Sequence, residues 1–205
     1  MPQNPLSMLA LGARRRFNAT LLVSAISVAL PCSTLAAEPA AMPKVRLSTS
    51  LGDILLQLDP AKAPKTVANF IQYVQDKHYD GTVFHRVISN FMIQGGGLGP
   101  DLRQKATREP IPLEASNGLK NDRGTIAMAR TANPNSATAQ FFINVVNNAA
   151  LNAPSPDGHG YAVFGKVIEG MDVVDKITAV PVGNKGMHQN VPQQPVTILK
   201  ATLEN

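Results

Sequence analysis

The sequence predicts a mainly β domain, an antiparallel barrel or sandwich with helical caps. About eight short apolar runs have the length and alternation expected of β-strands. Only two segments show the spacing of an amphipathic helix. The strands and helices do not follow a repeating strand–helix–strand order, and this favours an antiparallel arrangement over a parallel sheet.

The first 37 residues have the features of an export signal. Three arginines at positions 14–16 precede an apolar run at 19–30, and small residues follow up to Ala37. We therefore divide the chain into a signal peptide (1–37), a flexible lead-in (38–43) and one domain (44–205), and expect cleavage near Ala36 or Ala37. An uncleaved N-terminal anchor is the alternative, although the apolar run is short for a membrane span.

Composition excludes several classes of site. The formal charge of +5 falls to about +2 once Arg14, Arg15 and Arg16 are set aside, and no basic stripe indicates a nucleic-acid binder. Cys32 is the only cysteine, so the exported chain would hold no disulfide and no thiolate nucleophile or metal ligand. The four histidines are scattered without the paired spacing of a zinc site. We expect neither a metal nor a cofactor.

The beginning of the domain predicts a strand pair followed by a helix. Runs at 45–47 and 53–58 flank a glycine-containing turn. Pro64 suits the first turn of a helix, because its missing N–H costs little there. Four apolar residues follow at the spacing of one buried helical face: Val67, Phe70, Ile71 and Val74. The helix should end before Asp80.

The remaining elements are mostly strands separated by long irregular stretches. The strands are expected at 82–88, 91–95, 125–130, 139–144, 161–167 and 194–203. A short helix at 171–177 should turn Val173, Val174 and Ile177 inward. Alternation in the strand 139–144 places Gln140 and Phe142 on one face, and Phe141 and Ile143 on the other. The loops at 96–123, 147–160 and 182–194 have lengths often linked to function.

The stretch 84–97 (FHRVISNFMIQGGG) is the candidate for function. Arg86 brings a permanently charged, planar fork of donors. Phe91 and Met92 can form an apolar wall, and the glycines let the backbone approach a neighbour closely. This pattern predicts a groove that holds an apolar group and hydrogen-bonds an amide. The alternative is an ordinary strand with one solvated arginine, and His85 is expected to be a packed core histidine more than a catalytic one.

These residues also carry a family resemblance. The ordered motifs are 84–88 with 91–96, 124–129, 136–142, 163–167 and 170–174. Together they make residues 45–203 resemble the cyclophilin-type peptidyl-prolyl cis-trans isomerases, and the export signal and short loops resemble the bacterial periplasmic branch. The resemblance implies a closed eight-stranded antiparallel barrel capped by two α-helices.

The same resemblance implies a function and a set of site residues. The chain would accelerate rotation about X–Pro bonds in exported or folding proteins, without a covalent step or cofactor. Arg86 matches the catalytic arginine of the family. The remaining matches are to substrate-binding positions: Phe91, Met92, Gln94, Ala129, Arg130 (through its backbone), Gln140, Phe142, Leu151 and Tyr161.

Two positions depart from the family pattern. Ala150 stands where many members have a tryptophan, which argues against strong cyclosporin binding, and Tyr161 stands where many have a histidine. The implied partners are proline-containing peptides and unfolded exported proteins in the periplasm, bound by a monomer without nucleic acid and without stable membrane insertion. A proline-binding chaperone or scaffold is the main alternative. A purely structural barrel would leave Arg86 beside Gln94 and Phe142 unexplained.

Overall fold

The computed structural model describes residues 42–204, so the predicted signal peptide and residues 38–41 of the lead-in lie outside the described part. The elements of the described domain are β1 (Lys44–Thr49), β2 (Gly52–Leu58), α1 (Pro64–Gln75), β3 (Arg86–Ile88), β4 (Met92–Gly95), β5 (Thr125–Met128), β6 (Phe141–Asn144), the 3₁₀ turn η1 (Ala149–Leu151), β7 (Val163–Glu169), α2 (Met171–Thr178), β8 (Val182–Lys185), β9 (His188–Pro192) and β10 (Ile198–Glu204). The mainly β class with two helices is confirmed.

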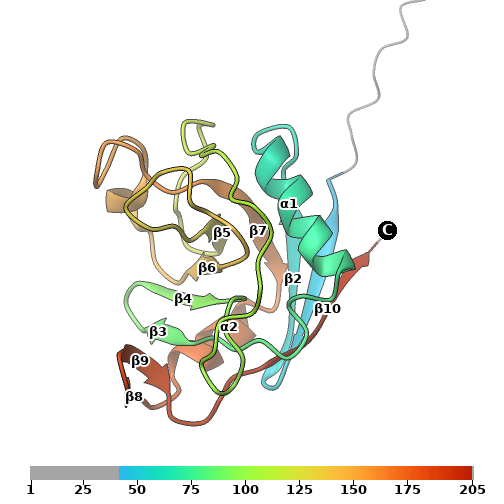
Figure 1. The fold of residues 1–205 in the computed structure, drawn as a ribbon, viewed down its shortest axis with the longest axis vertical. Helices are drawn as coiled ribbons and strands as arrows, with labels where there is room; N and C mark the ends of the chain where they lie inside the picture. Colours follow the sequence, from blue (N-terminus) through green and yellow to red (C-terminus); the bar gives the residue numbers. More distant parts are fainter. Residues whose placement is uncertain (1–41, 205) are drawn as a thin grey trace, which may run out of the picture. The chain divides into compact units, whose positions relative to one another are not determined.

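Eight strands form one curled antiparallel sheet in the order β10-β1-β2-β7-β5-β6-β4-β3 (Figure 1). The predicted closed barrel is wrong, because the edge strands β3 and β10 do not pair with each other. Instead, irregular segments just before them meet: the Phe84 amide donates to the Val196 carbonyl (2.9 Å). The Gly81 amide also donates to the Ile198 carbonyl, and the Ile198 amide to the Thr82 carbonyl (both 2.8 Å). These segments share only one isolated bridge, between Val83 and Thr197, so no strand pair closes the gap. The sheet is therefore a half-barrel.

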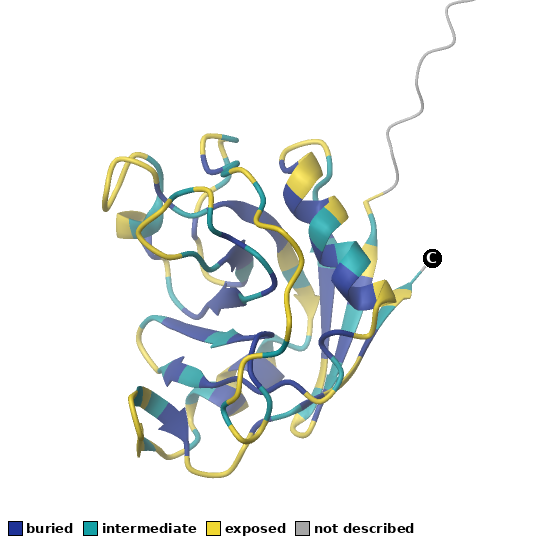
Figure 2. Ribbon diagram, in the orientation of Figure 1, coloured by how far each residue is buried: buried dark blue, intermediate teal, exposed yellow. Residues whose placement is uncertain are grey.

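Both predicted helices are present and cover this sheet. Helix α1 begins at Pro64 and ends at Gln75, so the predicted start and the predicted end before Asp80 are both confirmed. It contacts β10, and one side of it is buried (Figure 2). The Phe70 ring lies 5.0 to 5.6 Å, between centroids, from the rings of Tyr79, Phe164 and Phe141. Helix α2 buries its predicted apolar residues and contacts β2, β3 and β4. Across residues 42–204, neither length nor hydropathy allows any helix to span a membrane.

The stretch 182–194, predicted as a loop, contains the hairpin β8–β9. Its turn passes through Gly186, whose φ of +60° lies in the left-handed region that glycine adopts readily. The strand β8 is largely exposed and has no apolar alternation, so the sequence pattern gave no strand signal. Strand β9 of the hairpin contacts β3, the strand that carries Arg86.

Candidate active site

The register of neighbouring strands places three of the predicted site residues in one row. Arg86 of β3 lies opposite Gln94 of β4, and Gln94 lies opposite Phe142 of β6. Directly opposed residues of an antiparallel pair project from the same face of the sheet. The side chains of Arg86, Gln94 and Phe142 are therefore neighbours, although as many as 56 positions separate them in the sequence.

The two faces of β6 serve different purposes. Phe141 and Ile143 pack into the main core, as the alternation predicted. Phe142 belongs to a second apolar cluster with Met92, Ala127 and Val163. Six partly buried apolar residues pack against this second cluster: Ile88, Phe91, Leu119, Ala129, Leu151 and Tyr161. The curled sheet thus carries an apolar surface that does not pack into the main core.

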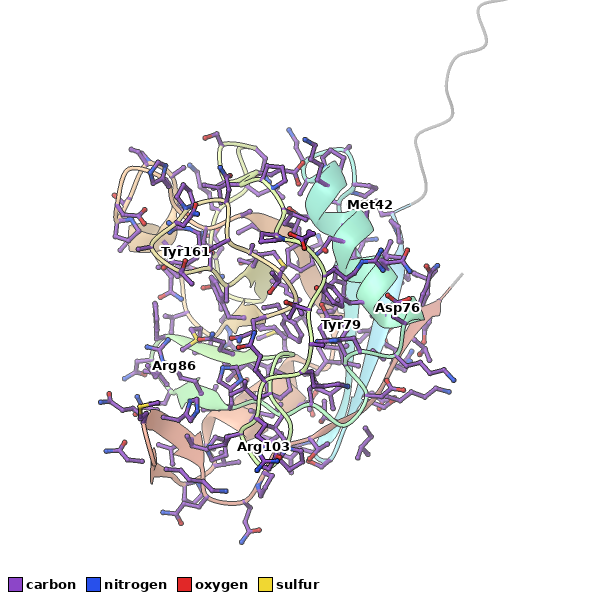
Figure 3. The ribbon with its side chains drawn as sticks, viewed as in Figure 1. Met42, Asp76, Tyr79, Arg86, Arg103 and Tyr161 are labelled. Carbon is purple, nitrogen blue, oxygen red and sulfur yellow. The ribbon has the colours of Figure 1, made fainter. Side chains whose placement is uncertain are left out.

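A hollow of about 130 Å³ opens on this second cluster. Arg86 and Tyr161 both reach it, and they lie on the same side of the ribbon (Figure 3). Its lining consists of Arg86, Phe91, Met92, Gln94, Ala129, Arg130, Phe142, Leu151 and Tyr161. The structure thus brings together all predicted site residues except Gln140, which lines an adjoining hollow. The lining combines an apolar slot with two permanently charged residues, Arg86 and Arg130.

A short chain of amides orients the cationic edge of the hollow. Arg86 Nη1 donates to Gln94 Oε1 (3.4 Å), and Gln94 Nε2 donates to Gln140 Oε1 (3.0 Å). Gly97 makes room for this arrangement, because a Cβ there would lie 2.7 Å from both Cδ and Nε2 of Gln140. The predicted close approach at the glycine run is confirmed at this position.

The adjoining hollow, of about 280 Å³, extends the groove past Gln94, Ala129 and Arg130. Five further residues line it that were not among the predicted site residues: Gln104, Thr107, Thr131, Ser136 and Thr138. They lie outside the helices and strands, where no periodicity marks a face. For Gln104 and Thr107 the signal in the sequence was the length of the stretch 96–123, and Ser136 and Thr138 lie within the family motif 136–142.

His85 lies beside Arg86 in sequence but not in the hollow. Its residue surface is 7% exposed, and its Nδ1 has no hydrogen-bond partner. Burial lowers the pKa of His85 to about 4, so the ring is neutral at neutral pH. His85 was predicted to be packed and hydrogen-bonded; its burial is confirmed, whereas Nδ1 makes no hydrogen bond. Within residues 42–204, no three His, Cys, Asp or Glu side chains gather in a way that could hold a metal ion.

Residues 44–203 match the family model described as cyclophilin type peptidyl-prolyl cis-trans isomerase/CLD. The chain belongs to this family. The peptidyl-prolyl cis-trans isomerase of Streptomyces antibioticus is 61% identical to this cyclophilin over 164 residues, covering 79% of this chain and 99% of the relative. Peptidyl-prolyl cis-trans isomerase B of Escherichia coli K12 is 56% identical over 161 residues, covering 78% and 98%.

Solved structures agree with this assignment. A cyclophilin-type isomerase of Cryptosporidium parvum aligns with a TM-score of 0.69 and 29% identity, covering 80% of this chain and 98% of that one. A second structure of that protein was obtained in the presence of the dipeptide Ala-Pro, and aligns with a TM-score of 0.68. This cyclophilin is therefore a peptidyl-prolyl cis-trans isomerase, and the row of Arg86, Gln94 and Phe142 is the candidate for its active site.

Proposed function

We propose that Arg86 catalyses X–Pro rotation by stabilising the twisted imide. Amide resonance sets a barrier of about 18–20 kcal/mol to this rotation. In the twisted state the proline nitrogen becomes pyramidal and regains a lone pair. A donor aimed at that nitrogen binds the twisted state more strongly than either planar state, and such differential binding is what lowers a barrier. No covalent step is required.

The shape of the hollow supports this role. Phe142 is 5% exposed and, with Met92, forms an apolar floor on which a proline ring can rest. Phe91 and Leu151 pack against the same cluster and border the slot. An apolar slot excludes water, which strengthens a hydrogen bond from Arg86. The single observation that carries the proposal is the Arg86 guanidinium at the edge of this slot, hydrogen-bonded to Gln94.

The same arrangement assigns roles to the polar groups and to the groove edge. Gln94 holds Arg86 and is itself held by Gln140. The backbone of Ala129 and Arg130 lies along the groove, where an extended peptide can run beside it. Tyr161 completes the lining of the slot.

The experiment compares wild type with Arg86→Ala in a protease-coupled assay on a proline peptide. A hydrogen bond from a charged group contributes about 1.5–3 kcal/mol, so kcat/KM should fall roughly 10- to 150-fold. Peptide binding, measured by calorimetry, should persist. Arg103→Ala is the matched control, since this side chain is 89% exposed and lines neither hollow. Full turnover by Arg86→Ala would overturn the role. A proline-binding scaffold would instead bind the peptide with no turnover in the wild type.

We further propose that the chain is exported to the periplasm and acts there, as a monomer, on unfolded exported proteins. The support is the charged, apolar and small-residue order of residues 1–37. Fractionation followed by mass spectrometry should find a mature chain beginning near Glu38 in the periplasm. Leu22→Arg, which interrupts the apolar run, should leave the full-length chain in the cytoplasm. Cleaved wild-type protein in the cytoplasm would contradict the proposal, and size-exclusion chromatography tests the monomer.

A further inference from the structure

The loop of residues 152–160 forms one end of the proline slot without secondary structure of its own. Leu151 and Tyr161 stand at its two ends, and the Tyr161 amide donates to the Leu151 carbonyl (2.9 Å). Both side chains line the slot. Residues 154–159 are exposed, so core packing does not fix the middle of the loop. Some other contact must hold the loop and the Tyr161 ring in place.

The side chain of Arg130 supplies this contact. It is only 1% exposed, although the residue stands at the rim of the groove. Nε and Nη2 both donate to the Gly160 carbonyl (3.0 and 2.8 Å), and Nη1 donates to the Thr131 carbonyl (2.9 Å). Nη2 also donates to Asp157 Oδ1 at 2.8 Å. A buried guanidinium needs this full set of partners, because a charge left unpaired away from water is costly.

The same guanidinium also stacks on the tyrosine. The central carbon of Arg130 lies 4.5 Å from the centre of the Tyr161 ring, within the range of a cation–π contact. The Tyr161 ring also contacts Phe142 in the slot, where the two rings meet edge to face with centroids 5.6 Å apart. One continuous set of contacts therefore runs from the exposed loop through Arg130 to the floor of the slot.

Two further features make the arrangement specific. Gly160 has a φ of +73°, and a Cβ there would overlap the backbone of Ala153. Only glycine can therefore occupy this position, where the backbone carbonyl accepts the hydrogen bonds from Arg130. The hydrogen bond from Arg130 holds the pKa of the Asp157 carboxyl below its ordinary value. The carboxylate is therefore charged throughout the neutral range and can pair with Arg130.

We propose that Arg130 and Asp157 are positioning residues, which hold Tyr161 against Phe142 and thereby set the affinity of the slot for its peptide. They do not touch the reacting bond. A loosened Tyr161 ring weakens the binding of substrate and transition state alike, so the loss appears in KM and leaves kcat nearly unchanged. This inference rests on the proposed role of the slot, and its test does not depend on Arg86.

The first test is Asp157→Asn, which keeps the shape of the side chain and removes its charge. Asp157 is 37% exposed, so the variant should fold. KM should rise about three- to tenfold with kcat within twofold, as expected when a charged hydrogen bond and the cation–π contact that it holds are weakened. Asp175→Asn is the matched control, because it removes the same charge from another arginine pair, Arg123 with Asp175, which lines neither hollow.

A second readout separates positioning from general stability. The chain has three tyrosines and no tryptophan, and Tyr73 and Tyr79 lie in the core. With ¹⁹F-labelled tyrosine, Tyr161→Phe identifies the Tyr161 signal. Asp157→Asn and Arg130→Lys should shift that signal and leave the two core signals in place, whereas Asp175→Asn should shift none. An unchanged KM together with an unmoved Tyr161 signal would overturn the inference. If Arg86→Ala retained full turnover while these shifts appeared, the catalytic role would fail and the positioning role would stand.

Discussion

Gly97→Ala should impair catalysis by displacing Gln140, although Gly97 itself lines neither hollow. The φ of Gly97 lies outside the left-handed region, so alanine can adopt this backbone conformation. The new Cβ would lie 2.7 Å from Cδ and Nε2 of Gln140, whereas ordinary contacts lie at about 3.5–4.0 Å. The Gln140 side chain must therefore move by about 1 Å or more.

This displacement breaks the hydrogen bond from Gln94 to Gln140 and frees the amide that orients Arg86. A neutral hydrogen bond contributes about 0.5–1.5 kcal/mol, so kcat/KM should fall roughly three- to tenfold. The free energy of unfolding should fall by about 1–3 kcal/mol, because the new Cβ also overlaps Cγ of Gln140, close to the backbone, and overpacking forces this side chain out of its rotamer. The assay is protease-coupled isomerisation, with unfolding in urea measured on the same samples.

Two comparisons make the reasoning refutable. Gly183→Ala is the matched control, because its Cβ would meet only Gln193 Nε2 at 3.9 Å. If the effect passes through Gln140, then Gly97→Ala combined with Gln140→Ala should be no worse than Gln140→Ala alone, since coupled sites are not additive. Wild-type activity in Gly97→Ala, or additive losses in the double variant, would refute the amide chain as the support of Arg86.

Two other outcomes follow from the same structure. Phe142→Ala should raise KM about tenfold by removing the floor of the slot, while binding unchanged from wild type by calorimetry would count against the floor. The lowered pKa of His85, about 4 against an ordinary value of 6.5, means that the unfolded chain binds more protons between these pH values. Stability should therefore fall by about 3 kcal/mol as pH drops from 6.5 to 4. His85→Leu should flatten this dependence in urea titrations, and an equally steep dependence in both proteins would contradict the assignment.

Local patterns in the sequence determined most of the elements and the central row of the site. Alternation in the stretch 139–144 predicted that Phe142 would leave the core face that Phe141 occupies, and the two residues do lie in separate clusters. The helix spacing after Pro64 and the turn between β1 and β2 were likewise readable, because these features depend on neighbours a few positions apart. The stretch 84–97 pointed to Arg86 and the family motifs added Gln94, and the strand register then explained their pairing.

Only the tertiary structure decided the features that depend on distant partners. The sheet stays open because the segments before β3 and β10 meet only at an isolated bridge between Val83 and Thr197, and no strand pattern reveals where such distant segments meet. The hairpin β8–β9 escaped prediction because the largely exposed strand β8 lacks alternation. The sequence placed Arg130 at the groove through its backbone, but its side chain turns away to Asp157 and Tyr161, about 30 residues further along. Alternation and spacing encode which face a residue occupies, whereas the meeting of two loops depends on hydrogen bonds and charges that form only when the whole chain has folded.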